Sequence, residues 1–264
     1  MPALHWFAQW VVVTAAAARI GRRSRGTPSR RYCFAGIVAG VAAFVPAPAT
    51  AAQIGAVISI FSDDRFRGVS VSDGRPVATL DLSYDAPNGL YASVSGTLVD
   101  TRDEGPRALS VAINGGFAKQ LRSGLTADFG ALQVRYSHYS GLSSGRDFTE
   151  AYAGLAGKNI GGRISVSPNY FELARWTAHG EVDAHFDLSP NTALEGEAGL
   201  LVPFGRSTYG ANLGSQVDAH LGLVQRAGPL TFHAAVSARS SGQAIYGGKG
   251  NGRVAIVLGI STIL

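Results

Sequence analysis

The chain has 264 residues, a single cysteine and a formal net charge of +5. The positive charge belongs to the N-terminus, because residues 52–264 hold 17 basic and 18 acidic side chains, a net charge of −1. With no basic stripe to neutralise phosphates, the sequence argues against a nucleic-acid partner. Because the one cysteine is Cys33, disulfides and thiolate metal sites are excluded beyond it.

The N-terminal region has the pattern of an export signal. Several arginines between positions 22 and 31 precede an apolar run from Tyr32 to Val45, and small residues follow for cleavage after Ala51. A further apolar stretch, residues 6–20, lies upstream of the basic cluster, which favours an early start codon over an overlong signal. We predict a signal peptide with an N-terminal extension at residues 1–51 and a β-barrel at residues 52–264.

Residues 52–264 contain no segment close to the roughly 20 apolar residues of a membrane-spanning helix, so any membrane contact must be made by strands. Period-two alternation bounded by Gly, Pro, Asn, Asp and Ser predicts twelve strands. Each has about the 9 to 11 residues of a tilted membrane-crossing strand. The strands are expected to start near Gln53, Pro76, Leu90, Ala108, Leu125, Phe148, Gly162, Thr177, Thr192, Ser215, Leu230 and Gly252. The last strand is apolar on one face, as the closing seam of an outer-membrane barrel requires.

The predicted connections alternate between short and long. The short ones are residues 85–89, 119–124, 157–161, 189–191 and 226–229. The others are residues 72–75, 100–107, 140–147, 168–176, 203–214 and 240–251, and all but the first of these are long. Short periplasmic turns and long external loops are typical of outer-membrane barrels, whereas a soluble sandwich shows no such bias.

The strand expected to start at Thr177 separates its two faces most clearly. His179, Glu181 and Asp183 alternate with small or apolar residues such as Gly180 and Val182. A charged side chain facing lipid costs about 2–4 kcal/mol near the bilayer midplane. The polar face should therefore point into a wet, charged lumen.

The same reasoning applied to the other strands predicts a lumen in which acids outnumber bases. The candidate lumen-lining residues are Asp81, Asp128, Glu150, Arg163, His179, Glu181, Asp183, His185, Glu195, Glu197, Asp218, His220, His233 and Arg239, together with Arg135. Such a field would favour cations, but a self-satisfied ion-pair network filling a narrow barrel fits the pattern equally well. In the fifth strand the alternation breaks between Ala131 and Leu132, which predicts a bulge there.

The sequence gives little support for an active site or a metal site. His179, Glu181, Asp183 and His185 share one strand face and could hold a metal ion, but no partner that would orient them is identifiable. Serines lie near histidines without a G-x-S-x-G or other nucleophile signature. We expect no enzyme activity, no cofactor and no bound metal.

Near the first strand the residues Ser62-Asp63-Asp64-Arg65-Phe66-Arg67-Gly68-Val69-Ser70 are followed by Ser72-Asp73-Gly74-Arg75-Pro76. This segment resembles the opening motif of the Gcw_chp family of proteobacterial outer-membrane proteins, S-D-x-x-F-R-G-x-S followed by S-D-G-x-P. The motif residues here are Ser62, Asp63, Phe66, Arg67, Gly68 and Ser70. Asp64 departs from the family, where an aromatic residue is common. The resemblance implies an outer-membrane barrel and brings no substrate or catalytic residue.

Arg67 has two physical interpretations. It could point inward and pair with lumen acids, or it could lie with Arg65 in the water-exposed rim. We favour the inward orientation.

Together these patterns predict an all-β protein, a transmembrane antiparallel up-and-down barrel of about 12 strands in the outer membrane of a Gram-negative cell. The expected function is a porin-like passive pore for small hydrophilic solutes. The expected partners are outer-membrane lipid, the barrel-assembly machinery during biogenesis and a small solute. One alternative is a non-conducting structural or surface-interaction barrel that acts through its external loops; another is a soluble periplasmic β-sandwich.

Overall fold

The computed structural model describes residues 52–101, 103–137, 147–172, 176–204, 214–240 and 253–264. The predicted signal peptide lies outside these ranges, as does most of the predicted loops at 140–147, 203–214 and 240–251. None of the described residues forms a helix long and apolar enough to cross a membrane.

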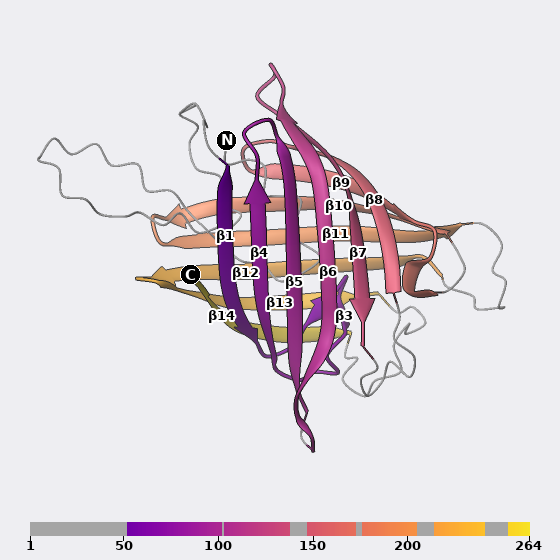
Figure 1. The fold of residues 1–264 in the computed structure, drawn as a ribbon, viewed down its shortest axis with the longest axis vertical. Helices are drawn as coiled ribbons and strands as arrows, with labels where there is room; N and C mark the ends of the chain where they lie inside the picture. Colours follow the sequence, from indigo (N-terminus) through magenta and orange to yellow (C-terminus); the bar gives the residue numbers. More distant parts are fainter. Residues whose placement is uncertain (1–51, 102, 138–146, 173–175, 205–213, 241–252) are drawn as a thin grey trace, which may run out of the picture.

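Twelve strands close into an antiparallel barrel in which neighbours in sequence are paired and the last strand pairs with the first (Figure 1). They are β1 (Gln53–Phe61), β4 (Val77–Asp85), β5 (Leu90–Thr101), β6 (Gly105–Gln120), β7 (Thr126–Tyr136), β8 (Asp147–Ala156), β9 (Ile160–Ser167), β10 (Trp176–Ser189), β11 (Thr192–Phe204), β12 (Gln216–Ala227), β13 (Leu230–Arg239) and β14 (Val254–Ile263). The predicted fold is confirmed, and every predicted strand start falls within a few residues of the observed one. The β-sandwich alternative is wrong, because β1 pairs with both β14 and β4 and so leaves no open sheet edge.

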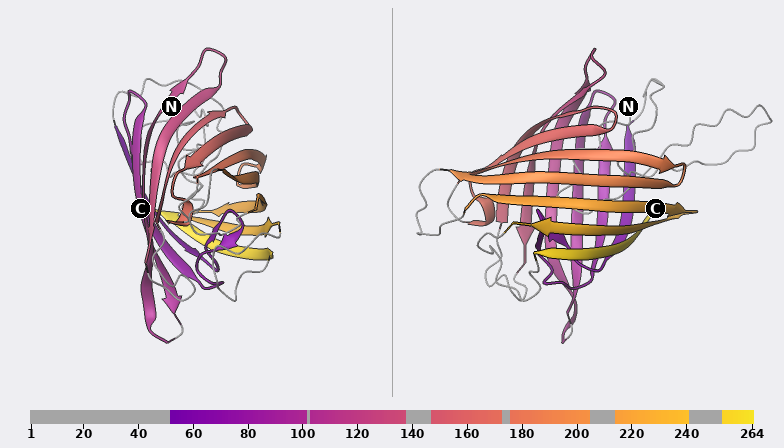
Figure 2. Two further views of the ribbon diagram at one scale, coloured as in Figure 1. Left: turned by 90° about the vertical axis from the view of Figure 1, so that its right-hand side faces the viewer. Right: turned by 180° about the vertical axis from the view of Figure 1, so that it is seen from behind.

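The barrel is flattened. Strands β4–β7 form one wall and β10–β13 the opposite wall, and the strands of the two walls cross at a steep angle (Figure 2). The described N- and C-terminal strands meet at the seam between β1 and β14, where Ile60 pairs with Ile260. The short turns lie at the end of the barrel where the described chain begins and ends.

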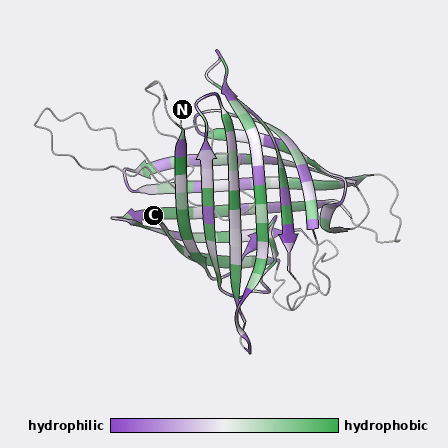
Figure 3. Cartoon of the chain, viewed as in Figure 1, coloured by the Kyte–Doolittle hydropathy of each residue, from purple (hydrophilic) through white to green (hydrophobic). Residues whose placement is uncertain are grey.

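The outer surface is apolar and the inner surface polar, so hydropathy alternates along each strand (Figure 3). In β10, Val182 is 56% exposed, whereas His179 and Asp183 on the opposite face are 1% and 2% exposed. The outward side chains form a belt of the kind that meets lipid hydrocarbon. The belt includes Leu80, Leu82, Val94, Ile113, Phe129, Ile164, Leu221, Leu223, Phe232, Val236, Ile256 and Leu258.

The predicted bulge in the fifth strand is wrong. Strand β7 keeps its register with both neighbours, so Leu132 and Val134 point inward and Arg135 points outward, where its Nε lies 2.9 Å from a carboxylate oxygen of Asp147. The register shift lies instead in β6, where Leu109 is the extra residue opposite Thr97 and Leu98 of β5. The alternation only seemed to break because the lumen accepts apolar side chains at this height.

Two predicted connections are also wrong. The first is not residues 72–75: the chain leaves β1 at Phe61, enters the barrel and returns to the wall at Val77, forming β2 (Arg65–Phe66) and β3 (Val69–Ser70) on the way. We call residues 62–76 the lumen hairpin. The second, predicted at residues 100–107, is a tighter hairpin, because β5 and β6 extend to Thr101 and Gly105, whose side-chain hydroxyl and carbonyl oxygen form a 2.6 Å hydrogen bond.

Candidate functional site: a polar lumen crossed by a hairpin

The lumen hairpin turns at Arg67 and Gly68. Their φ angles are +49° and +72°, so both central residues of this two-residue turn lie in the left-handed region. A hairpin turn with positive φ at both positions favours Asn, Asp or Gly at the first. The backbone preference of arginine therefore does not explain why it occupies the first position of this turn.

The carboxylate of Asp63 holds the hairpin together. It accepts hydrogen bonds from the Ser70 hydroxyl at 2.5 Å, the Ser72 hydroxyl at 2.9 Å and the Arg65 guanidinium at 2.8 Å. Arg65 also donates to the Gly68 carbonyl oxygen at 2.7 Å. The motif positions Asp63 and Ser70 thus shape the hairpin from within.

Phe66 anchors the hairpin in an aromatic pocket at the end of the barrel opposite the short turns. Its ring centroid lies 5.2 Å from Phe148 of β8, and 5.9 and 6.4 Å from Phe171 and Tyr170 of the short helix η2 (Tyr170–Glu172). Burial of each such aromatic side chain contributes about 1.5–3 kcal/mol. The pocket is completed by inward apolar side chains of the wall, namely Val77, Val99, Leu109, Leu132, Val134 and Tyr136.

Arg67 reaches from the turn to the wall. Its two Nη atoms lie 2.8 and 2.9 Å from the two carboxylate oxygens of Glu150 on β8, a bidentate pair that is almost fully buried. Its guanidinium also lies over the rings of Phe66 and Tyr170, at 4.7 and 5.3 Å. Burial lowers the pKa of Arg67, but the charge and hydrogen bonds of Glu150, together with Tyr170 and Glu181, raise it more, so that the pKa lies above its ordinary value and the guanidinium stays charged. The inward orientation predicted for Arg67 matches this geometry.

Gly68 touches the opposite wall. A Cβ atom added to it would lie 2.7 Å from the Ala238 carbonyl oxygen and 2.9 Å from the Arg239 Cβ, both on β13. The hairpin tip therefore bridges the lumen, with the Arg67 side chain on β8 and the Gly68 backbone on β13.

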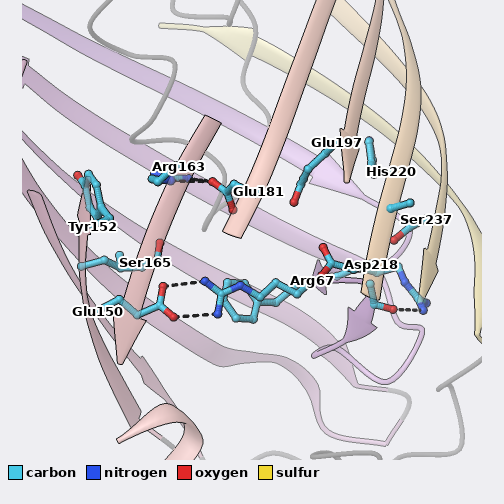
Figure 4. Close-up of a pocket in the computed structure, with 15 residues that line it drawn as sticks. Arg67, Glu150, Tyr152, Arg163, Ser165, Glu181, Glu197, Asp218, His220 and Ser237 are labelled. Atoms are coloured by element: carbon cyan, nitrogen blue, oxygen red, sulfur yellow. Dashed lines mark hydrogen bonds and ion pairs between the residues drawn. The ribbon is translucent and has the colours of Figure 1, made fainter. Parts of the chain in front are cut away.

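A second ion-pair network runs along the inner face of neighbouring strands beside the hairpin (Figure 4). The Arg163 Nε and Nη2 lie 2.6 and 2.5 Å from one carboxylate oxygen of Glu181, and the guanidinium lies over the Tyr152 ring at 5.0 Å. The two ring nitrogens of His179 lie 3.2 Å from Glu181 and 3.2 Å from Asp218. Strands β9, β10 and β12 are thereby linked inside the barrel.

A third network lies nearer the short turns. The Tyr91 hydroxyl lies 2.7 Å from Asp128 and 2.6 Å from the Tyr152 hydroxyl, which in turn donates to the Asn114 side-chain oxygen at 2.7 Å. The Tyr152 ring covers Gly130 of β7, so that a Cβ there would overlap its hydroxyl and lie 2.7 Å from the Gly115 carbonyl oxygen.

We expect Gly130→Ala to destabilise the barrel by about 1–3 kcal/mol, because the added methyl group displaces Tyr152 and breaks this network. Unfolding by urea in lipid vesicles measures the change. Gly96→Ala is the matched control, since a Cβ at Gly96 meets no atom within 4 Å. Equal stability of the two variants would contradict the role assigned to this contact.

Two lumen acids face each other without a basic partner between them. Asp183 and Glu197 are directly paired across β10 and β11, and one oxygen of Asp183 is buried with no hydrogen-bond partner. Like charges placed directly opposite on neighbouring strands are destabilising. Asp81 of β4 also has one buried oxygen without a partner. Among the residues that the structure describes, none of these three acids forms an ion pair with a basic side chain.

The remaining candidates lie inward, some of them half-buried, except Arg135: its predicted place in the lumen is wrong, because it lies on the outward face of β7. His185 lies 3.3 Å from Asp187 and 3.4 Å from Glu195, and His233 shares a 3.0 Å hydrogen bond with the Ser261 hydroxyl. His220 and Arg239 are half-buried on β12 and β13. Within the ranges the structure describes, no three His, Cys, Asp or Glu side chains come together as metal ligands.

Two small cavities lie beside the lumen hairpin. One, of about 40 Å³, lies between the hairpin, Glu150, Arg163, Glu181 and Glu197 (Figure 4). The other, of about 80 Å³, lies between the hairpin, Glu195, His220 and His233. Since one water molecule needs about 10–15 Å³ on this measure, each holds a few waters. The lumen is narrow at the level of the hairpin.

Sequence reasoning missed the tyrosines. Tyr91 and Tyr152 are on inward positions and carry much of the hydrogen bonding around Asp128, although neither is charged at neutral pH. The available signal was an inward tyrosine next to a strand with glycine at its centre, as at Gly116 and Gly130.

A family model described as "Bacterial protein of unknown function (Gcw_chp)" matches residues 46–254. The chain belongs to the Gcw_chp family. The match includes the lumen hairpin and all strands up to the start of β14. The segment that resembles the family's opening motif lies within this match and is the one that enters the barrel.

Solved structures similar to this member of the Gcw_chp family are outer-membrane barrels. The NanC porin has a TM-score of 0.53 and 13% identity, over 79% of this chain and 100% of that chain. The KdgM porin has 0.48 and 11%, over 79% and 98%. The COG4313 outer membrane channel from Pseudomonas putida F1 has 0.46 and 10%, over 84% and 97%. No protein of curated function matches the sequence. The resemblance to the NanC porin shows a porin-like barrel fold.

Proposed function

We propose that this Gcw_chp protein is a porin-like channel of the outer membrane that passes small hydrophilic solutes and prefers cations. The observation that carries the proposal is a lumen lined by acids and enclosed by a barrel whose outer belt is apolar. The apolar belt supports a location in a bilayer, and a lumen lined by charged side chains suits the passage of hydrophilic solutes. Outer-membrane lipid and the barrel-assembly machinery are the partners that this location requires.

The cation preference rests on the acids that no base neutralises. Glu150 is paired with Arg67, and Glu181 with Arg163, so neither contributes much net field. Asp183 and Glu197 lie opposite one another on β10 and β11. Rings or pairs of carboxylates lining a narrow pore raise the local concentration of cations and repel anions.

The test is the reversal potential of single channels in a planar bilayer under a KCl gradient. We expect steady cation-selective steps, and a cation-to-anion permeability ratio lowered by about threefold or more in the double variant Asp183→Asn with Glu197→Gln. The control is Asp100→Asn with Glu104→Gln, which removes the same charge from exposed positions at the end of the β5–β6 hairpin. An unchanged ratio in the lumen variant would contradict selectivity by these acids.

A second candidate is a non-conducting barrel that acts through its external loops. The observation in its favour is the lumen hairpin, beside which two small cavities lie. A correctly folded barrel that shows no conductance, even after the hairpin is removed, would favour this candidate over the channel.

A further inference from the structure

We propose that the lumen hairpin is a gate and that the Arg67–Glu150 ion pair is the latch that keeps it closed. This inference rests on the proposed channel function. It assigns a role in opening and closing the pore to the motif by which the family is recognised.

The first argument is the identity of the residue at the turn. Arg67 has φ +49° at a position that favours Asn, Asp or Gly. A residue held in an unfavourable backbone conformation persists only where its surroundings compensate. Here the compensation is the bidentate pair with Glu150 and the two aromatic rings beneath the guanidinium. The side chain of Arg67, rather than its backbone, accounts for its presence.

The second argument is how the hairpin is attached. Its own hydrogen bonds close within the segment, from Val71 N to Asp64 O and from Asp64 N to the Ser72 hydroxyl. It joins the hydrogen-bonded backbone of the wall at its two ends, where Ser62 N donates to Leu258 O and Asp100 N donates to Pro76 O. The hairpin can therefore leave the lumen as one unit while the barrel ladder stays intact.

The third argument is where the contacts lie. The tip touches two opposite walls, through Glu150 on β8 and Ala238 on β13. Both contact points are near the strand ends that lead into the long connections, so the hairpin sits close to the mouth it would leave by. It is seated by three buried apolar side chains, Phe66, Val69 and Val71, and by the ion pair of Arg67.

The first experiment separates the latch from the turn. Arg67→Asn places a residue that suits positive φ at the turn and removes the ion pair, so we expect the hairpin to fold but to release, raising the open probability of single channels by about tenfold. Arg135→Asn is the matched control, because it breaks an arginine–carboxylate pair on the outside of the barrel. The exchange Arg67→Glu with Glu150→Arg should restore closure. Open probabilities that are equal in Arg67→Asn and the control would overturn the latch.

The second experiment locks the hairpin. Residues 52–264 contain no cysteine, so Arg67→Cys with Glu150→Cys introduces the only thiols of the barrel. We expect this variant to conduct when reduced, to fall silent after treatment with a short reducible bis-thiosulfonate cross-linker, and to recover on reduction. Conductance that survives cross-linking would overturn the gate and leave the channel standing.

A deletion of residues 64–74 distinguishes failure of the gate from failure of the channel. We expect this variant to fold, shown by heat-modifiable migration on a gel, and to conduct permanently. If the folded deletion variant is silent, the channel function fails, and the gate fails with it. If it conducts no better than the unaltered protein, only the gate fails.

Discussion

Replacing Arg163 with glutamine should lower the free energy of unfolding by about 3–5 kcal/mol, because Glu181 would remain buried without its ionic partner. Both side chains are at most 5% exposed, and two nitrogens of Arg163 contact the same oxygen of Glu181. The loss should be visible in urea titrations in lipid vesicles. Trp176 is the only tryptophan in residues 52–264, so its fluorescence reports on a single site.

Two further variants test whether the loss of stability comes from the unpaired charge of Glu181. Arg163→Gln combined with Glu181→Gln should recover much of the lost stability, since no unpaired charge is left in the lumen. Arg135→Gln breaks an ion pair whose arginine side chain is 74% exposed, and it should cost less than about 1 kcal/mol. If Arg163→Gln were as mild as Arg135→Gln, the lumen would be far wetter than the geometry indicates.

The second large effect is expected from pH. Burial, with a smaller contribution from the neighbouring charge of Asp63, raises the pKa of Asp64 on the lumen hairpin from 3.8 to about 7. A hairpin that has left the lumen should have an Asp64 carboxyl near its ordinary pKa. Asp64 therefore binds its proton more tightly when the hairpin is inside the lumen, so protonation of Asp64 stabilises the hairpin there. This stabilisation is full below pH 3.8 and is lost as the pH rises through 7.

We therefore expect channels to open more often as the pH rises from 6 to 8, by about tenfold in open probability if one proton is linked to seating. Asp64→Asn should stay closed at pH 8 and lose this response. Other titratable or charged groups surround Asp64 or line the same cavity: Asp63 and Arg65 of the hairpin, Asp81 of β4, Tyr136 of β7, Glu195 of β11, His220 of β12 and His233 of β13.

The histidine variants His220→Gln and His233→Gln serve as controls for this assignment. They should keep the pH response if Asp64 is responsible for it. A response that persists in Asp64→Asn and disappears in either histidine variant would transfer the effect to the imidazoles and contradict the role of Asp64.

The wall of the barrel was predictable because alternation has a single physical cause. In β10, lipid on one side and a polar lumen on the other force Val182 and Asp183 onto opposite faces, and this pattern is visible residue by residue. The ends of this alternation also made the strand starts and the short turns predictable.

The hairpin was not predictable by the same logic. Residues 72–75 have the Ser, Asp and Gly of an ordinary turn, so local chemistry favoured a surface loop there. The inward Leu132 and Val134 were the tertiary signal, because an apolar side chain in a wet lumen implies that something apolar covers it. That signal was interpreted as a bulge, since alternation alone cannot distinguish lipid from an apolar side chain inside the barrel.

The pairing of charged side chains inside the lumen was the other feature that the sequence did not predict. Sequence patterning placed Glu150 on an inward position but could not pair it with Arg67, whereas Arg163 and Glu181 lie directly opposite each other on the neighbouring strands β9 and β10. Arg67 and Glu150 are 83 positions apart, and their pairing depends on the path of the hairpin across the barrel.

The most direct test of the account is solute flux into proteoliposomes that contain the purified protein, measured by swelling with neutral and cationic solutes of graded size. The account predicts slow entry of small hydrophilic solutes, faster entry of cationic ones, and a marked increase for both when Arg67 is replaced by asparagine. Absence of flux for every solute, in the unaltered protein and in the folded variant without residues 64–74, would contradict it.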